Sequence, residues 1–148
     1  MTTSRFTPDI GTEIIVIYSV SGDVGGLLER MLEHRGYFPL RAASEKQVLS
    51  LHDNALLSAL IIMDRRDADT TKKLSRSLRQ RSSTLPIIVV MERPDEDRAI
   101  DLLENGVDQY ILPPFRAETL LRALNATTRR QRSSSRLEFA ARNGRSPI

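Results

Sequence analysis

Short runs of apolar residues, separated by longer polar stretches, restrict the possible fold of this chain more than any other feature of its sequence. Residues 14–17 read Ile-Ile-Val-Ile, and similar runs occupy residues 59–63, 86–91 and 109–112. The runs are continuous rather than alternating and are rich in β-branched residues, which is typical of strands buried on both faces. A further segment at residues 37–40 contains Pro39, so it is predicted to form a strand at the edge of the sheet.

Helical patterns fill the segments between these runs. Apolar residues recur at helical spacing from residue 24 to residue 32, and Gly36 is placed to end that helix. Ser44 and Gln47 fit a capping box that begins a second helix. Three more helices are predicted at residues 70–81, 94–106 and 117–124, of which the first is polar enough to lie largely exposed.

The alternation of five strands with five helices indicates the fold class. It predicts parallel βαβ units joined by right-handed crossovers, with helices on both faces of a doubly wound α/β sheet. In such folds the functional crevice lies beyond the carboxyl ends of the strands. The candidate site therefore comprises the segments that follow the strands, at residues 18–23, 64–69, 91–93 and 112–114.

Composition divides the chain into a polar leader at residues 1–12, a folded domain at residues 13–129 and a basic, Ser- and Arg-rich tail or linker at residues 130–148. The net charge is +3, but from Arg129 onward six arginines stand against a single acid, Glu138. The preceding residues are therefore mildly acidic, and no basic patch is expected on the domain. Nucleic acid is expected to bind at most weakly, through the tail.

Residue types exclude several other kinds of site. The chain has no cysteine, which rules out disulfides and Cys-based metal or redox sites. The Gly-rich segment at residues 19–26 matches neither nucleotide-binding glycine motif. His34 and His52 fall on predicted helix ends without neighbouring ligand residues and are expected at the surface. With no signal peptide and no run of membrane-spanning length, a cytoplasmic protein without membrane contact is expected.

Two segments carry a family resemblance. Residues 85–90 read Leu-Pro-Ile-Ile-Val-Val, and residues 104–115 read Glu-Asn-Gly-Val-Asp-Gln-Tyr-Ile-Leu-Pro-Pro-Phe. The second is similar to the signature E-x-G-A-D-x-Y-L-x-K-P-F of the receiver domain of bacterial two-component response regulators, and residues 35–37, Arg-Gly-Tyr, also match that family. The resemblance covers about residues 13–129 and implies a flavodoxin-like, five-stranded parallel sheet in the order 2-1-3-4-5 with five helices.

The resemblance also implies a pocket of five groups. Two acids after the first strand and a phosphoacceptor Asp hold Mg²⁺, while a hydroxyl after the fourth strand and a Lys after the fifth bind the phosphoryl oxygens. The metal and the Lys offset the repulsion between a carboxylate and a phosphate. In this chain the phosphoacceptor position is Asp64. The other positions carry unsuited residues: Tyr18 and Ser19, or Ser19 and Val20, replace the acids, Met91 the hydroxyl and Pro113 the lysine.

Neighbouring acids are not expected to rebuild the pocket. Asp23 suits the start of the first helix, and Asp67 and Asp69 suit a cap on the third. No basic group is expected to replace the lysine. No metal, cofactor or catalytic residue is therefore predicted, and Asp64 is interpreted as a remnant in a loop or cap, with a phosphoacceptor as the alternative.

The function predicted on this basis is that of an atypical receiver, or pseudo-receiver, which is not an enzyme. It would act as a phosphorylation-independent protein-interaction module in a bacterial two-component pathway, with a kinase, a regulator or an output domain as its partner. By family analogy, the surface formed by the fourth helix, fifth strand and fifth helix binds that partner or a second copy of the chain. The contacts expected there are Arg98, Asp101, Tyr110 and Arg122.

Two alternatives stay open at the level of sequence. One is the N-terminal regulatory domain of a larger transcriptional regulator or output enzyme, for which the basic, Ser-rich tail would suit a linker. The other is a receiver that is still phosphorylated at Asp64.

Overall fold

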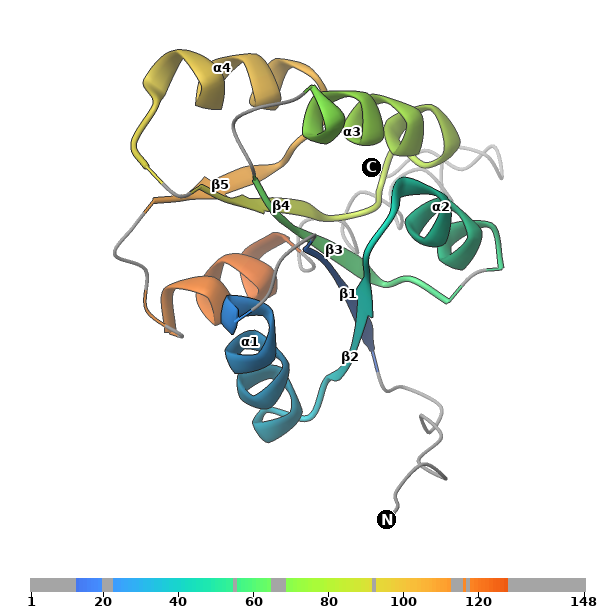
Figure 1. Ribbon diagram of the computed structural model, residues 1–148, viewed down its shortest axis with the longest axis vertical. Coiled ribbons are helices and arrows are strands. Elements are labelled where there is room, and N and C mark those ends of the chain that lie inside the picture. Colours follow the sequence, from blue (N-terminus) through green and yellow to red (C-terminus); the bar gives the residue numbers. More distant parts are fainter. Residues whose placement is uncertain are drawn as a thin grey trace, which may run out of the picture.

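The computed structural model describes residues 13–19, 23–54, 56–64, 69–91, 93–112, 116 and 118–127, with the backbone alone at residues 23–25. Its five strands form one parallel sheet in the order β2-β1-β3-β4-β5, which confirms the predicted order (Figure 1). The strands are β1 (Ile14–Tyr18), β2 (Phe38–Ala42), β3 (Ala59–Met63), β4 (Ile87–Val90) and β5 (Gln109–Ile111).

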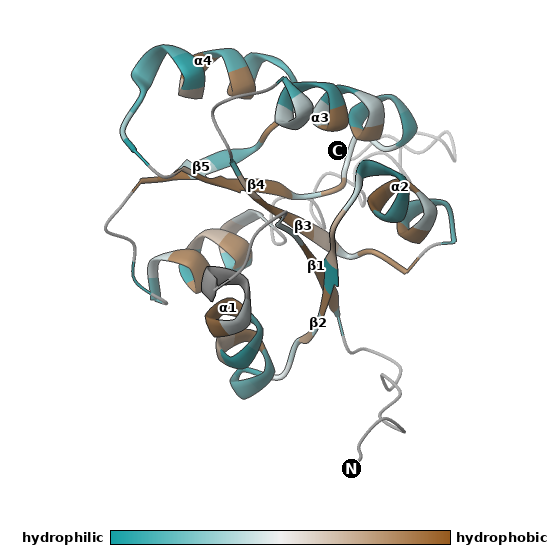
Figure 2. Ribbon diagram, viewed as in Figure 1, coloured by the Kyte–Doolittle hydropathy of each residue, from teal (hydrophilic) through white to brown (hydrophobic). Residues whose placement is uncertain are grey.

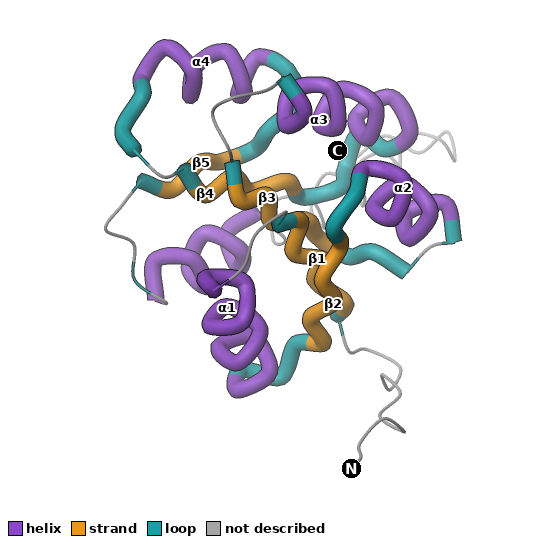
Figure 3. The backbone as a smooth tube through the Cα atoms, in the orientation of Figure 1, coloured by secondary structure: helices purple, strands orange, loops and turns teal. Residues whose placement is uncertain are grey.

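Helices cover both faces of the sheet, as Figures 1 and 3 show. They are α1 (Asp23–His34), α2 (Glu45–Asp53), α3 (Thr70–Arg81) and α4 (Glu96–Glu104), followed by a fifth helical segment at residues 118–127. One face carries α2, α3 and α4, and the other carries α1 and residues 118–127. The doubly wound architecture predicted from the sequence is therefore confirmed.

The core consists of two apolar layers, one on each face of the sheet. Successive side chains of a strand point to opposite faces, so Leu60 and Ile62 of β3 pack beneath α2–α4 while Ala59 and Ile61 pack against α1 and residues 118–127. Figure 2 shows the apolar strands between helices whose outer sides are polar. Strands buried in this way must be apolar at every position, which explains the continuous runs in the sequence.

The helix boundaries follow from local chemistry. Ser44 Oγ accepts a hydrogen bond of 3.2 Å from the Gln47 N–H, and Gln47 Oε1 accepts one of 2.7 Å from the Ala43 N–H, which together form the predicted capping box, displaced by one residue on its second arm. Gly36 and Gly106, with φ of 89° and 106°, follow the ends of α1 and α4. Both adopt the left-handed conformation that favours glycine.

The prediction that α3 lies largely exposed is wrong. Thr71, Leu74, Ser75 and Leu78 are buried. These residues form one stripe along the helix at helical spacing. The sequence of α3 is polar on average, so its overall polarity does not reveal that one side of the helix is buried. Asp69 occupies the N-cap position of α3 as expected, although its side chain makes no capping hydrogen bond; Asp67 lies outside the described residues.

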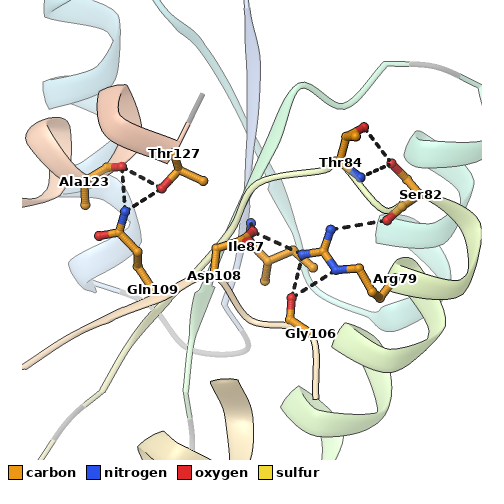
Figure 4. A network of polar contacts seen from close by, with 9 residues as sticks. All are labelled: Arg79, Ser82, Thr84, Ile87, Gly106, Asp108, Gln109, Ala123 and Thr127. Atoms are coloured by element: carbon orange, nitrogen blue, oxygen red, sulfur yellow. Dashed lines mark hydrogen bonds and ion pairs between the residues drawn. The ribbon is translucent and has the colours of Figure 1, made fainter. Parts of the chain in front are cut away.

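A polar network joins α3 to the amino ends of β4 and β5 (Figure 4). Arg79 of α3 donates from Nη2 to the Gly106 carbonyl at 2.5 Å and to Asp108 Oδ2 at 3.1 Å. The same Asp108 oxygen accepts a 2.7 Å hydrogen bond from the N–H of Ile87, the first residue of β4. Gly106 and Asp108 belong to the family-like segment. Both stabilise the fold at the amino ends of the strands, whereas the candidate site lies at their carboxyl ends.

The same part of the chain also holds the fifth helical segment in place. Gln109 Nε2 donates to Thr127 Oγ1 at 2.6 Å and to the Ala123 carbonyl at 3.3 Å (Figure 4).

Among the described residues, no helix is both long enough and apolar enough to cross a lipid bilayer.

Candidate functional site

Asp64 stands at the carboxyl end of the central strand β3 and faces the helices above it. Its N–H donates to the Val90 carbonyl at 2.9 Å, which continues the pairing with β4 by one residue. Ile62 points toward the α2–α4 side, so the alternation of the strand directs Asp64 to that side as well. The side chain is 0% exposed, and a carboxylate buried to this degree requires partners.

Arg98 of α4 provides a forked contact to this carboxylate. Its Nε lies 2.6 Å from Asp64 Oδ2 and its Nη2 lies 2.7 Å from Asp64 Oδ1. Thr71 of α3 donates a third hydrogen bond, from Oγ1 to Asp64 Oδ1 at 2.8 Å. Both carboxylate oxygens are thus engaged, and the forked geometry is the strongest that an arginine makes with a carboxylate.

The two helices place these partners for identifiable reasons. Asp95 caps α4 by accepting a 3.1 Å hydrogen bond from the Arg98 N–H, which sets Arg98 in the first turn of the helix, next to the end of β3. Thr71 lies in the first turn of α3, on the same buried stripe as Leu74 and Leu78. The inward face of α3 therefore delivers a hydroxyl to Asp64.

The electrostatics keep Arg98 charged. The hydrogen bond to Asp64 raises the pKa of Arg98, and the negative charges of Asp64, Asp95 and Asp69 raise it further, while burial acts in the opposite direction. The Arg98 side chain is only 18% exposed. Asp64 and Arg98 consequently form an ion pair between a fully buried acid and a partly buried base, in which each charge compensates the other.

The sequence predicts no basic group beside Asp64, but Arg98 lies there. Nor does Asp64 serve as a helix cap, since Asp69 occupies the N-cap position of α3. Sequence reasoning missed this contact because it joins residues 34 positions apart. One signal was present, because a basic residue in the first turn of a helix lies at the wrong end of the helix dipole and needs another reason to be there.

The remaining pocket positions are mostly buried. Tyr18, at the end of β1, is 6% exposed, and burial, with a smaller contribution from Glu45, raises the pKa of its phenol. Ser19 is buried and its N–H donates to the Ala42 carbonyl at 3.2 Å. Met91 is 1% exposed and its side chain belongs to the apolar layer beneath α2–α4. Val20 and Pro113 lie outside the described residues.

The described residues do not fit a Mg²⁺ site. They contain no group of three His, Asp or Glu side chains that could hold a metal ion. Mg²⁺ requires near-octahedral oxygen ligands, whereas both carboxylate oxygens of Asp64 already bind a guanidinium.

The four predicted interface residues separate into two groups. Arg98 points inward to Asp64, and Asp101 pairs with Lys72 at 3.2 Å. Tyr110 is 36% exposed, and Arg122 is exposed as well. Sequence reasoning did not single out the exposed apolar side chains of α4 and of the residue after β5, which are Ile100, Leu103 and Leu112.

Comparison with known proteins gives a consistent set of relatives, although no family model matches the chain. The transcriptional regulatory protein YxdJ of Bacillus subtilis is 32% identical over 130 residues, which cover 88% of this chain and 55% of that protein. The response regulator ArlR of Staphylococcus saprophyticus is 28% identical over 122 residues, covering 79% and 53% of the two chains. The chain thus spans about half the length of these curated relatives.

The fold has solved counterparts. The CheY-like response regulator receiver domain protein from Methanospirillum hungatei superposes with a TM-score of 0.73 at 19% identity, covering 83% of this chain and 98% of that one. At this level of identity the likeness is one of fold.

Proposed function

The chain belongs to the receiver domains of two-component response regulators, and from that premise we propose that it signals by protein contact, without phosphorylation of Asp64. The observation that carries this proposal is the state of the Asp64 carboxylate, which is fully buried and bound by Arg98 and Thr71 on both oxygens. The domain would act as an interaction module and not as an enzyme.

The chemistry of phosphoryl transfer supports the proposal. A carboxylate that attacks a phosphate needs an accessible oxygen and cations that offset the repulsion between the two anions. Here the cation, Arg98, is bound to the nucleophile itself, so attack would require the buried fork to open first. Met91 offers no donor at the position where a hydroxyl would bind the transferred group.

An exposed apolar group supplies a surface for contact. Ile100 and Leu103 of α4 are 49% and 39% exposed, and Tyr110 and Leu112 in and after β5 are 36% and 38% exposed. We call these four residues the α4–β5 face. The two elements contact each other, and exposed apolar side chains on neighbouring elements are typical of protein-interaction sites, where tyrosine is also enriched. The proposed partner is a kinase, a regulator or an output domain.

Incubation with acetyl phosphate or phosphoramidate, followed by intact-mass measurement, tests the absence of phosphorylation. We expect no added phosphate on the wild-type chain under conditions that phosphorylate a receiver with a complete pocket. A stable phosphate that is lost in Asp64→Asn would contradict the proposal and revive a phosphorylated receiver.

Charge substitution tests the surface. Leu103→Glu should weaken partner binding, whereas Leu27→Glu is a matched control, because Leu27 is 49% exposed on α1, on the other face of the sheet. Sedimentation of the two variants distinguishes a second copy of the chain from a different partner. Equal binding by both variants would contradict the role of the α4–β5 face.

A second candidate function is the regulatory domain of a transcriptional regulator. The match to about half of YxdJ, which is described as a transcriptional regulatory protein, favours it. In a protein that joins this chain to an output domain, Leu103→Glu should alter the output, while Leu27→Glu should not. An unchanged output would count against this candidate.

A further inference from the structure

We infer that Arg98 is a built-in cation of the pocket, and that its contact with Asp64 fixes the first turn of α4 and thereby the way the α4–β5 face is presented. The signalling consequence rests on the proposed function. The mechanical coupling between the pocket and α4 rests on the contacts alone.

The apolar attachment of α4 to the domain is small. Of its nine residues, Ala99 and Leu102 are buried, and the first of these carries a single methyl group. An isolated helix of nine residues is not stable in water and takes its order from tertiary contacts. The ion pair in its first turn adds a specific, directional link between α4 and the end of β3, and removing one partner leaves the other charge uncompensated.

The contact acts close to the proposed interaction surface. Arg98 is held through its main chain by Asp95 and through its side chain by Asp64. Ile100 follows two residues later on the same helix, on the exposed side. Any change in the position of Arg98 thus moves the α4 part of the face, because a helix this short moves as one body.

The residue type suits this role. A guanidinium engages both oxygens of a carboxylate in one plane, which an ammonium or a single hydroxyl does not. A cation that is covalently part of α4 cannot dissociate, unlike a metal ion. The pocket therefore stays neutralised at any concentration of metal ion or phosphodonor, and α4 stays in one position.

Hydrogen exchange of the full chain tests the inference. In Arg98→Met we expect the amides of α4 to exchange about tenfold faster or more, because the helix then opens locally, while the amides of β1 and β3 keep their protection. Lys72→Met is the matched control, since it removes the more exposed ion pair between α3 and α4 and should change α4 exchange by less than about twofold. Arg98→Lys should fall between wild type and Arg98→Met.

Two outcomes would overturn the inference. One is a folded Arg98→Met chain with unchanged α4 exchange, and the other is an equal effect in Lys72→Met. If Arg98→Met does not fold, Arg98→Lys and Asp64→Asn, which keep a polar group at the contact, decide the same comparison.

The experiment uses neither phosphodonor nor partner, so it separates the two proposals. Phosphorylation of wild-type Asp64 would contradict the proposed function and leave the α4 result standing. Unchanged α4 exchange would overturn the coupling whatever the phosphodonor does.

Discussion

Asp64 and Arg98 are 34 positions apart in the chain, yet their side chains meet through hydrogen bonds of 2.6 and 2.7 Å at the carboxyl end of β3. The pair places a cation from α4 on the acid that stands at the phosphoacceptor position of the receiver family. Because the acid is fully buried and the arginine partly so, the stability of each charge depends on the other.

Asp64→Ala should therefore destabilise the fold strongly. Removing one partner of a buried ion pair leaves the other charge uncompensated, and since Arg98 retains some exposure we expect a loss near the lower end of about 3–5 kcal/mol. Denaturant unfolding measures it. The double variant Asp64→Leu with Arg98→Met, which removes both charges, should be about as stable as wild type or more so; strictly additive losses would contradict a coupled pair.

Gly106→Ala should cost more stability than Gly36→Ala. Both glycines have positive φ, so alanine costs about 1–2 kcal/mol at either position. At Gly106 an added Cβ would also lie 3.2 Å from Arg79 Cβ and from the Ser75 carbonyl oxygen, whereas at Gly36 it would meet nothing within 4 Å. Crowding of this kind adds about 1 kcal/mol or more. Equal losses in thermal unfolding would argue against the close approach of α3.

Asp108→Ala tests the network at the amino ends of β4 and β5. It removes the acceptor of both the Ile87 N–H and Arg79, and we expect a loss of about 2–3 kcal/mol. Asp53→Ala is the control, because its ion pair with Arg81 is far more exposed and should contribute less than about 1 kcal/mol. Urea unfolding of both variants makes the comparison, and a small effect at Asp108 would show that the network is dispensable.

Tyr18 should make stability fall at high pH. Burial raises the pKa of its phenol above the ordinary value of 10.0, so the folded chain holds the proton more tightly than the unfolded chain. The resulting stabilisation is complete below pH 10.0 and is lost as the pH rises from there through the folded-state pKa. In Tyr18→Phe this component should be absent. If the stability difference between the two chains does not change with pH in that range, the phenol is not desolvated.

The candidate site could be predicted only in part. The positions of Asp64 after β3, of Tyr18 and Ser19 at the end of β1 and of Met91 after β4 follow from the strands that the apolar runs already reveal. In the segment most like the receiver family, Gly106 and Asp108 serve the fold by binding Arg79, whereas Tyr110 and Leu112 are exposed. The stripe that buries Thr71 was not evident because α3 is polar on average. The position of Arg98 in the first turn of α4 was a local signal, but it does not identify Asp64 as the partner.

Local chemistry and periodicity in the sequence determined the strands, their burial and the capping of α2. These properties depend on neighbours along the chain, or on strands that must be apolar because both faces are covered. Only the tertiary structure decided that the guanidinium of Arg98 compensates Asp64. Which charges meet in a buried pocket depends on how α3 and α4 pack across the sheet, and spacing along the chain does not contain that geometry.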